Sequence, residues 1–250
     1  SQKDESASGR HTERRCGRGS SPASKARPGE ILRPRRRTNL AAMKGSIPTA
    51  TVARLPLYLR CVSEVAPDQV TCSSEQLAES AGVNPAQVRK DLSYVDPPGV
   101  RGVGYDVAEL RAVLRRELGL TREHRVAIAG AGNLGNALTM YPGFNESGFN
   151  VVALFDTDPT KIGTRIDSLT VEPYETIGTI VAARDVSIGV IATPVKAAQE
   201  VADRFVEAGV RSILNFAPAV LKRPAGVEVR RVDLSTELQI LAYYEGRLGG

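Results

Sequence analysis

The spacing of apolar residues predicts helices in the first half of the chain. Val52, Leu55, Leu59 and Val62 recur at steps of three and four residues, which indicates an amphipathic helix beginning near residue 47. Pro56 lies inside this pattern and should weaken or kink the helix, because proline lacks a backbone donor. A similar pattern further on predicts another helix, with apolar residues at Leu110, Val113, Leu114 and Leu118. Gly119 should end this helix.

Between these helices, capping residues predict two short ones. Ser73 can form a capping box with the glutamine three residues later, and Gly82 can end that helix in the left-handed conformation. Asn84 is followed by a proline and by another glutamine three residues on, so a second box is expected at the start of a helix over 85–94. A turn-rich hairpin follows over 96–105. This order of elements is typical of a winged helix-turn-helix domain.

After residue 122, short apolar runs alternate with helical patterns. Such alternation predicts a doubly wound parallel sheet with helices on both faces, and therefore an α/β fold. Strands are expected over 126–129, 149–155, 186–192 and 212–216, and helices over 133–141 and 194–208. A last helix over 234–247, with leucines at helical spacing, is capped by Asp233 or Ser235.

Charge is unevenly distributed along the 250 residues, whose formal total is +5. Residues 1–45 carry 12 basic and 4 acidic side chains and few large apolar ones, so we expect a disordered basic tail. This tail could attract phosphates or could be a plain solvated extension. Residues 46–119 carry 8 basic and 9 acidic side chains, so net charge alone gives no reason to expect DNA binding there.

Several kinds of protein are excluded by what the sequence lacks. It has no apolar run of about 18 residues, which predicts no membrane-spanning helix. Its first residues lack the apolar stretch of a secretory signal. Three cysteines without metal-ligand spacing and two histidines make a zinc cluster implausible, so no metal is expected. We expect a reduced, cytoplasmic protein.

A glycine-rich turn between the first expected strand and the next helix predicts a dinucleotide site. Its sequence is Gly130-Ala131-Gly132-Asn133-Leu134-Gly135. In a Rossmann-type fold the first glycine forms the tight turn, the second lets a pyrophosphate approach the backbone, and the third lets the helix pack on the strand. Free N–H groups at the helix N-terminus then face the phosphates. The alternative is a glycine-rich turn without a ligand.

Asp156, 21 residues after Gly135, ends the second expected strand. Its carboxylate can accept hydrogen bonds from the adenosine ribose hydroxyls and would repel a 2′-phosphate. Because no arginine occupies the next three positions, we expect NAD(H) rather than NADP(H). An ordinary carboxylate at a strand end is the alternative.

No residue set typical of hydride-transfer catalysis accompanies this site, so no catalytic residue is expected. His124 precedes the first strand, on the side away from the cofactor, and no tyrosine is followed four residues later by a lysine. Lys161, Lys196 and Lys222 remain available, so an NAD-dependent oxidoreductase with a vestigial helical domain is the alternative function. A regulatory module that binds CoA or another nucleotide is a third possibility.

The helix over 85–94 carries the candidates for reading DNA. Arg89 and Lys90 can reach guanine edges or phosphates in the major groove, and Ser93 and Tyr94 can donate to phosphates. Arg101, in the wing, suits a narrow minor groove. We also expect DNA contacts from two residues nearer the N-terminus, Arg54 and Ser74. A small helical dimerisation or packing domain is the alternative.

The most distinctive segments lie between residues 46 and 250. They are Ile47-Pro48 to Arg60, Val88-Arg89-Lys90-Asp91-Leu92-Ser93-Tyr94, Arg101-Gly102-Val103-Gly104-Tyr105, Gly130–Gly135, Tyr141-Pro142-Gly143-Phe144, Val190-Ile191-Ala192-Thr193-Pro194, Asn215-Phe216-Ala217-Pro218 and Val232-Asp233-Leu234. In these segments the chain resembles the Rex family of redox-sensing transcriptional repressors.

This resemblance implies a homodimer that binds a palindromic operator, with the recognition helix in the major groove and the wing in the minor groove. NADH and NAD+ would compete for one site, and NADH would release the operator. The domains would be a tail (1–45), a winged-helix domain (46–119), a Rossmann domain (120–232) and a C-terminal helix exchanged between subunits (233–250).

The resemblance also implies roles for single residues. Thr193 and Pro194 would contact the cofactor, and Tyr141 would lie near the nicotinamide. Asp233 would pair with Arg60 in one redox state and with Tyr141 in the other, because only the oxidised ring is positively charged. As an alternative, these three switch residues are a helix cap, a solvated charge and a helix-end aromatic.

The chain departs from the family pattern in one place. After Tyr94-Val95 the family usually has a glycine, a small polar residue and an aromatic, whereas this chain has Asp96-Pro97-Pro98. Two prolines remove two N–H groups, and Asp96 adds negative charge close to phosphates. We therefore expect a reshaped wing or a weaker DNA contact.

Overall fold

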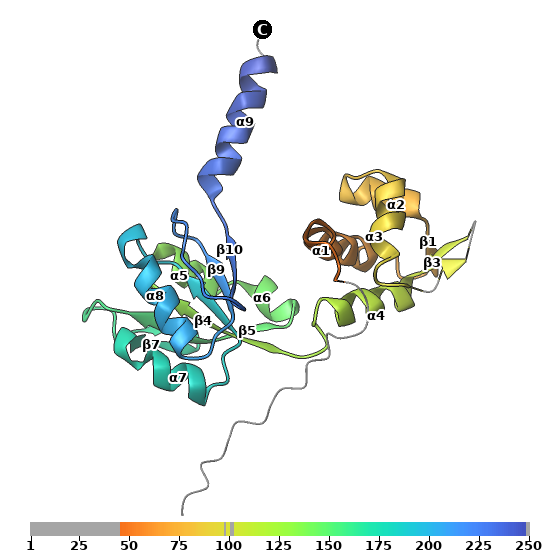
Figure 1. Cartoon of the computed structure of the whole chain (residues 1–250). Coiled ribbons are helices and arrows are strands. Elements are labelled where there is room, and N and C mark those ends of the chain that lie inside the picture. Colours follow the sequence, from red (N-terminus) through yellow and green to blue (C-terminus); the bar gives the residue numbers. More distant parts are fainter. Residues whose placement is uncertain (1–45, 98, 101–102, 249–250) are drawn as a thin grey trace, which may run out of the picture. The chain divides into compact units, whose positions relative to one another are not determined.

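The computed structural model of the chain describes residues 46–97, 99–100 and 103–248 (Figure 1). The expected tail over 1–45, the wing arginine Arg101 and Pro98 lie outside the described residues. The first described elements are α1 (Thr49–Ser63), β1 (Thr71–Cys72), α2 (Ser74–Ala81), α3 (Pro85–Leu92), β2 (Gly99–Val100), β3 (Gly104–Asp106) and α4 (Val107–Glu117).

The expected hairpin is present as the antiparallel pair β2 and β3. Strand β3 also pairs antiparallel with β1, so the small sheet has the order β1-β3-β2. Strand β1 was not predicted, because two residues are too short to show an alternating pattern.

Helix α1 runs without interruption past Pro56, and its buried face is only partly the predicted one. Leu55 and Val62 are buried, as expected, but Val52 is 44% exposed and Thr51 is buried in its place. The prediction for Val52 was wrong, because the buried face of α1 carries Thr51 in its place, where a polar contact holds it. The Thr51 hydroxyl donates to Asp91 on α3 over 2.9 Å.

The first predicted capping box is confirmed, and the second is half formed. Ser73 Oγ accepts from the Gln76 amide at 3.2 Å, and the Gln76 side chain accepts from the Ser73 amide at 2.9 Å. Asn84 Oδ1 likewise accepts from the Gln87 amide at 2.8 Å. The Gln87 side chain does not return to Asn84, because its amide donates to Asp91 at 2.9 Å.

A single buried carboxylate joins α1 to α3. Asp91 is fully buried and accepts from Tyr58 Oη at 2.8 Å and from two nitrogens of Arg54 at 2.6 and 2.9 Å, in addition to Thr51 and Gln87. Burial alone would raise the pKa of Asp91, but these donors outweigh it and lower the pKa to about 2. Burial, with the bond to Asp91, raises the pKa of Tyr58 to about 12.

The rest of the chain forms the predicted parallel sheet. Its elements are β4 (His124–Ala129), α5 (Asn133–Thr139), α6 (Pro142–Glu146), β5 (Phe149–Asp156), β6 (Arg165–Ile166), β7 (Leu169–Pro173), the 3-10 helix η1 (Tyr174–Thr176), α7 (Ile177–Ala183), β8 (Ile188–Ile191), α8 (Val195–Glu207), β9 (Ser212–Asn215) and β10 (Glu228–Arg231). The strand order is β10-β9-β8-β4-β5-β7-β6, and only β6 runs antiparallel to its neighbour. His124 is the first residue of β4 rather than preceding it, because its amide already bonds to Gly148.

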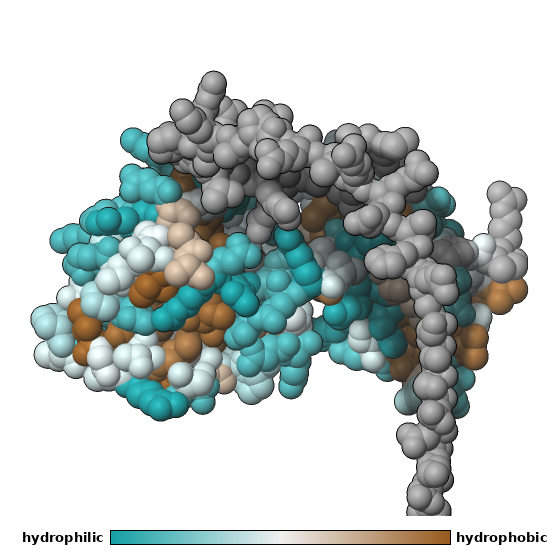
Figure 2. Space-filling view, turned by 90° about the horizontal axis from the view of Figure 1, so that it is seen from below, coloured by the Kyte–Doolittle hydropathy of each residue, from teal (hydrophilic) through white to brown (hydrophobic). Residues whose placement is uncertain are grey.

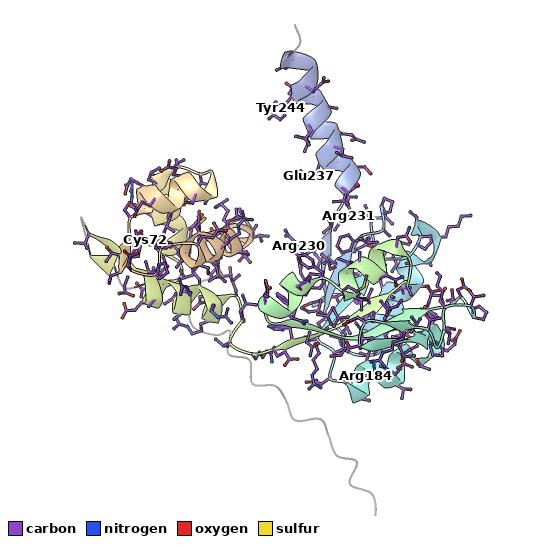
Figure 3. The ribbon with its side chains drawn as sticks, turned by 180° about the vertical axis from the view of Figure 1, so that it is seen from behind. Cys72, Arg184, Arg230, Arg231, Glu237 and Tyr244 are labelled. Carbon is purple, nitrogen blue, oxygen red and sulfur yellow. The ribbon has the colours of Figure 1, made fainter. Side chains whose placement is uncertain are left out.

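Alternate residues of the central strands enter two different cores, which is why both faces of the sheet are apolar. In β4, Ala127 and Ala129 lie in the core that α7 and α8 cover, whereas Val126 and Ile128 lie in a second core on the opposite face. Strands β6, β7 and β10 were not predicted. They lie toward the edges of the sheet, where polar residues interrupt the apolar pattern, as Glu228, Arg230 and Arg231 do in β10. Arg230 and Arg231 are labelled in Figure 3.

The last helix, α9 (Leu234–Leu248), carries apolar side chains that are exposed in the single chain. They include Leu234, Leu238, Leu241, Tyr243 and Tyr244, the last labelled with Glu237 in Figure 3. Of the two predicted caps, Asp233 is the one used: its Oδ1 accepts from the Ser235 amide at 3.1 Å.

None of the described helices is both long and apolar enough to span a membrane. On the face in Figure 2 the brown residues form a few groups among hydrophilic ones.

The Asp91 network gives a stability prediction. Asp91→Ala should lower the free energy of unfolding of the full chain by about 3 kcal/mol at pH 7, because it leaves Arg54 and Tyr58 without their buried acceptor. Urea unfolding followed by circular dichroism measures this loss. The exposed Asp68 is the matched control, and Asp68→Ala should cost less than about 0.5 kcal/mol. Equal losses in the two variants would contradict the prediction.

The same carboxylate predicts a pH dependence. The folded pKa of Asp91 is about 2, below the value of about 3.9 expected in the unfolded chain. Its stabilising effect is therefore complete above about pH 4 and is lost as the pH falls toward 2. In unfolding titrations the wild type should lose stability more steeply than Asp91→Ala over this interval, and parallel curves would argue against the assignment.

Candidate functional site

The strand order reverses between β4 and β8, which is where ligands bind in doubly wound sheets. A cavity of about 620 Å³ lies there. Its lining includes the last residues of β4 and β5, among them Asp156. The turns that follow β4 and β8 supply Gly130 and Thr193. The chain therefore builds one site from segments more than 60 residues apart.

The three motif glycines have different local requirements. Gly130 has φ +106°, and a Cβ there would lie 2.5 Å from the carbonyl oxygen of Ala192. A Cβ on Gly135 would collide with the carbonyl of Gly130. Gly135 is therefore needed for the packing of α5 against the glycine turn, and Gly130 for the close approach of this turn to Ala192. Gly132 has an ordinary φ of −88°, and a Cβ there would meet nothing within 4 Å. No steric conflict with the described residues requires glycine at 132, so the space beside it is open to a ligand.

Asp156 is tied into the glycine turn. Its Oδ2 accepts from the Ala131 amide at 2.8 Å and from Lys161 Nζ at 3.1 Å, and its Oδ1 accepts from the Asp158 amide at 2.9 Å. Burial tends to raise the pKa of Asp156, but these donors outweigh it and hold the pKa below its ordinary value. Asp156 therefore stays ionised at the cavity, in a fixed orientation.

Two features of this cavity were missed from the sequence. Lys161 was considered only as a possible catalytic group, yet it lies beside Asp156 and lines the cavity. Tyr174 and Glu200 also line it, and the Tyr174 hydroxyl donates to Glu200 Oε1 at 3.1 Å. A lysine five residues after the acidic strand end was a usable signal. The pair of Tyr174 and Glu200 had none, because β7 was not predicted.

The predicted cofactor residues are only partly brought together. Gly130, Gly132, Asp156, Thr193 and Pro194 line the cavity. The buried Oγ1 of Thr193 has no hydrogen-bond partner among the described residues, as expected of a group that faces a ligand. The other candidates lie outside the lining, and they are Ala131, Asn133, Leu134, Gly135 and Tyr141.

The predicted switch residues each have a local role in the single chain. Tyr141 is 55% exposed and packs edge-on against Phe144. Arg60 Nε donates to Glu64 on the same helix at 3.1 Å, in an exposed pair. Asp233 caps α9. These contacts are compatible with the structural alternative and leave the switch as a prediction.

Helix α3 presents basic side chains on its exposed face. Arg89 and Lys90 are exposed, whereas Val88, Asp91 and Leu92 are buried. Among the other candidates, the Ser93 hydroxyl donates to the carbonyl of Lys90 at 2.7 Å, and Ser74 accepts from Arg89. Arg54 is held by Asp91, so in this structure it supports α3, and its contact with DNA stays a prediction.

The backbone conformation at Asp96 bears on the departure from the family pattern, in which this chain has aspartate where the family usually has glycine. Its φ is +52°, a conformation that favours glycine. The family's usual glycine at this position is therefore explained by the backbone, and aspartate is among the residues that tolerate the left-handed region best.

Two family models match the chain. The model described as "Putative DNA-binding protein N-terminus" matches residues 46–93, and the model described as "CoA binding domain" matches residues 121–219. The first contains α1 to α3, and the second contains the glycine turn and Asp156.

Curated relatives decide the family. The chain is 55% identical over 211 residues to the redox-sensing transcriptional repressor Rex of Streptomyces griseus, covering 84% of this chain and 83% of that one. The chain belongs to the Rex family. The Rex repressor of Desulfitobacterium hafniense is 46% identical over 203 residues, covering 80% of this chain and 96% of that one. This Rex protein is therefore a redox-sensing transcriptional repressor and not an enzyme, which removes the oxidoreductase alternative.

Solved structures agree with this assignment. RSP, a Rex-family repressor, is 37% identical to this Rex protein with a TM-score of 0.74, covering 82% of this chain and 97% of RSP. The structure of RSP in complex with β-NAD+ and operator DNA has a TM-score of 0.77 at 37% identity, covering 82% and 95% of the two chains. RSP in complex with β-NADH has a TM-score of 0.74 at 36% identity, covering 82% and 97%. The expected α/β class, with a DNA-binding helical segment and a Rossmann-like parallel sheet, is confirmed.

Alanine substitutions at Gly132 and at Gly135 should have different effects. Gly132→Ala should lower the melting temperature by no more than about 3 °C, the effect of alanine at the N-cap of α5, and should weaken NADH binding by roughly tenfold or more, because its Cβ enters space that a ligand would use. Gly135→Ala should lower the melting temperature more, because its Cβ collides with backbone. Calorimetric titration with NADH and thermal melts separate the two. Unchanged NADH affinity in Gly132→Ala would contradict this assignment.

Proposed function

We propose that this Rex repressor binds operator DNA with an affinity set by the NADH/NAD+ ratio, and that NADH releases the DNA. The observation that carries the proposal is the cavity at the strand-order reversal, with room at Gly132 and an ionised Asp156, in the same chain as the exposed basic face of α3. The complexes of RSP with NAD+ and operator DNA and with NADH support it.

The cavity residues fit a dinucleotide. The turn at Gly130 and Gly132 would hold the pyrophosphate against backbone N–H groups. Asp156, already ionised and oriented, would accept from the ribose hydroxyls. The unpartnered Thr193 hydroxyl and Pro194 would contact the part of the cofactor nearest β8.

Asp156 favours NAD(H), although Lys161 reduces the strength of the argument from charge. A 2′-phosphate would meet two carboxylates, Asp156 and Asp158, and one ammonium group, Lys161, whose Nζ lies 3.1 and 3.9 Å from them. The same balance disfavours the phosphorylated ribose of CoA. The name of the family model for residues 121–219 makes CoA the ligand against which NADH should be compared.

Helix α3 would read the operator, with Arg89 and Lys90 in the major groove and Ser93 and Tyr94 on phosphates. Arg54 and Ser74 would contact the same DNA, and Arg101 would enter the minor groove. A palindromic operator follows if two copies of the chain bind it together.

The exposed apolar face of α9 supports a homodimer in which this helix is exchanged between subunits. Six large apolar or aromatic side chains of α9 would otherwise face water. We propose the boundaries 1–45, 46–119, 120–232 and 233–250 for the tail, the two domains and the exchanged helix. We also propose a cytoplasmic location for the protein.

The switch would use the charge difference between the two cofactor forms. The nicotinamide ring carries a positive charge only in NAD+, so a carboxylate near it experiences different attraction in the two states. Asp233 could then pair with Arg60 in one state, displacing Glu64, and with Tyr141 in the other. A coupling of about 1–3 kcal/mol would change DNA affinity roughly 5- to 150-fold.

Band shifts with the full chain test this function. On a palindromic duplex selected from random DNA in the presence of NAD+, NADH should weaken binding at least fivefold, and Arg89→Ala should weaken it without changing NADH affinity. Binding that is insensitive to NADH would overturn the proposal. Loss of both affinities in Arg89→Ala would mean that the variant is misfolded, and Lys90→Ala then serves as the second variant.

Calorimetry tests the choice of cofactor. NADH should bind more tightly than NADPH or CoA, and Asp156→Ala should reduce that preference because it removes the acceptor for the ribose hydroxyls. CoA binding as tight as that of NADH would overturn our interpretation of Asp156.

A further inference from the structure

The guanidinium group of Arg89 is held on one side by α2. Its Nη1 donates to Ser74 Oγ at 2.9 Å and to Glu75 Oε1 at 3.0 Å. The two N–H bonds of Nη1 are thereby used. The Ser74 hydroxyl is also 3.3 Å from Glu75 Oε1, which links the two acceptors.

The opposite edge of the same guanidinium is open. Within the described part of the chain, Nε and Nη2 of Arg89 make no hydrogen bond, and the side chain is 54% exposed. Nε and Nη2 present two parallel N–H groups, which is the fork that matches O6 and N7 of guanine. Arg89 lines a groove of about 470 Å³ together with Ser74, Glu75 and Ser93.

Glu75 keeps its charge in this position. Its own backbone N–H and the Ser73 hydroxyl, at the start of α2, lower the pKa of Glu75, and Arg89 lowers it further. A carboxylate next to a DNA-binding surface repels phosphates, so its presence there requires a compensating role.

We propose that Glu75, together with Ser74, is a positioning residue that fixes the Arg89 side chain so that its Nε–Nη2 edge reads a guanine of the operator. This rests on the proposed contact between Arg89 and DNA. A free arginine side chain has several rotamers and must be ordered on binding, whereas a clamped one has little entropy left to lose. Glu75 thereby acts on sequence preference rather than on general DNA affinity.

The test compares one DNA duplex with modified copies of itself. The full wild-type chain, with NAD+, selects a preferred duplex from random DNA, and each guanine in a half-site is replaced in turn by 7-deazaguanine, which lacks the N7 acceptor. For the wild type, one position should weaken binding about fivefold or more. Glu75→Ala and Arg89→Ala should lose this sensitivity at that position, and the double variant should behave like Arg89→Ala alone.

Glu79 provides the matched control. It is an exposed acidic residue of α2 one turn after Glu75, so Glu79→Ala removes the same charge and should keep the full sensitivity. Glu75→Ala should also keep its affinity for a duplex of shuffled sequence and its affinity for NADH. Equal weakening on selected and shuffled duplexes would show that Glu75 supports the fold only, and would overturn the proposal.

The remaining outcomes separate the two proposals. If Arg89→Ala abolishes selective binding while Glu75→Ala keeps the sensitivity to 7-deazaguanine, the clamp is wrong and the DNA contact stands. If the wild type is insensitive at every guanine, Arg89 does not read N7 and the clamp is likewise overturned. If Arg89→Ala binds DNA as the wild type does, the proposed recognition of DNA by Arg89 on α3 is overturned, and the clamp is overturned with it.

Discussion

A buried carboxylate sets the geometry of the DNA-binding part of the chain. Asp91 is surrounded by donors from α1 and from its own helix, and a charge in that position is stable only while they remain in place. Because Asp91 lies two residues after Arg89, this network fixes the rotation of α3 about its axis. The exposed face that carries Arg89 and Lys90 is a consequence of that rotation.

The same network couples helix α1 to helix α3. Helix α1 supplies Thr51, Arg54 and Tyr58 to Asp91, and two residues after Tyr58 it carries the exposed Arg60. Helices α1 and α3 are therefore held together through a partly buried ion pair.

The glycines of the candidate cavity differ in what the structure requires of them. Gly130 is required by the close approach of Ala192 and Gly135 by the packing of α5 on the glycine turn, whereas a Cβ on Gly132 would meet no described atom within 4 Å. Asp156 links two segments of the cavity lining, because its carboxylate accepts from the Ala131 amide in the glycine turn and from Lys161. The Asp156 carboxylate thus has a fixed orientation before any ligand enters, which lowers the entropy cost of binding.

The sequence by itself determined what depends on neighbours in the chain: the first capping box, the turn at Gly82, the alternation of strands and helices, and the glycine motif with its acid at Asp156. Short-range hydrogen bonds and periodicity encode these features. Only the tertiary structure decided that Gln87 turns to Asp91 rather than to its own cap, that Thr51 rather than Val52 is buried, and that Lys161 and Glu75 partner Asp156 and Arg89. A polar side chain has several partners of similar energy within reach, and the packing of distant elements selects one of them by removing water from the others.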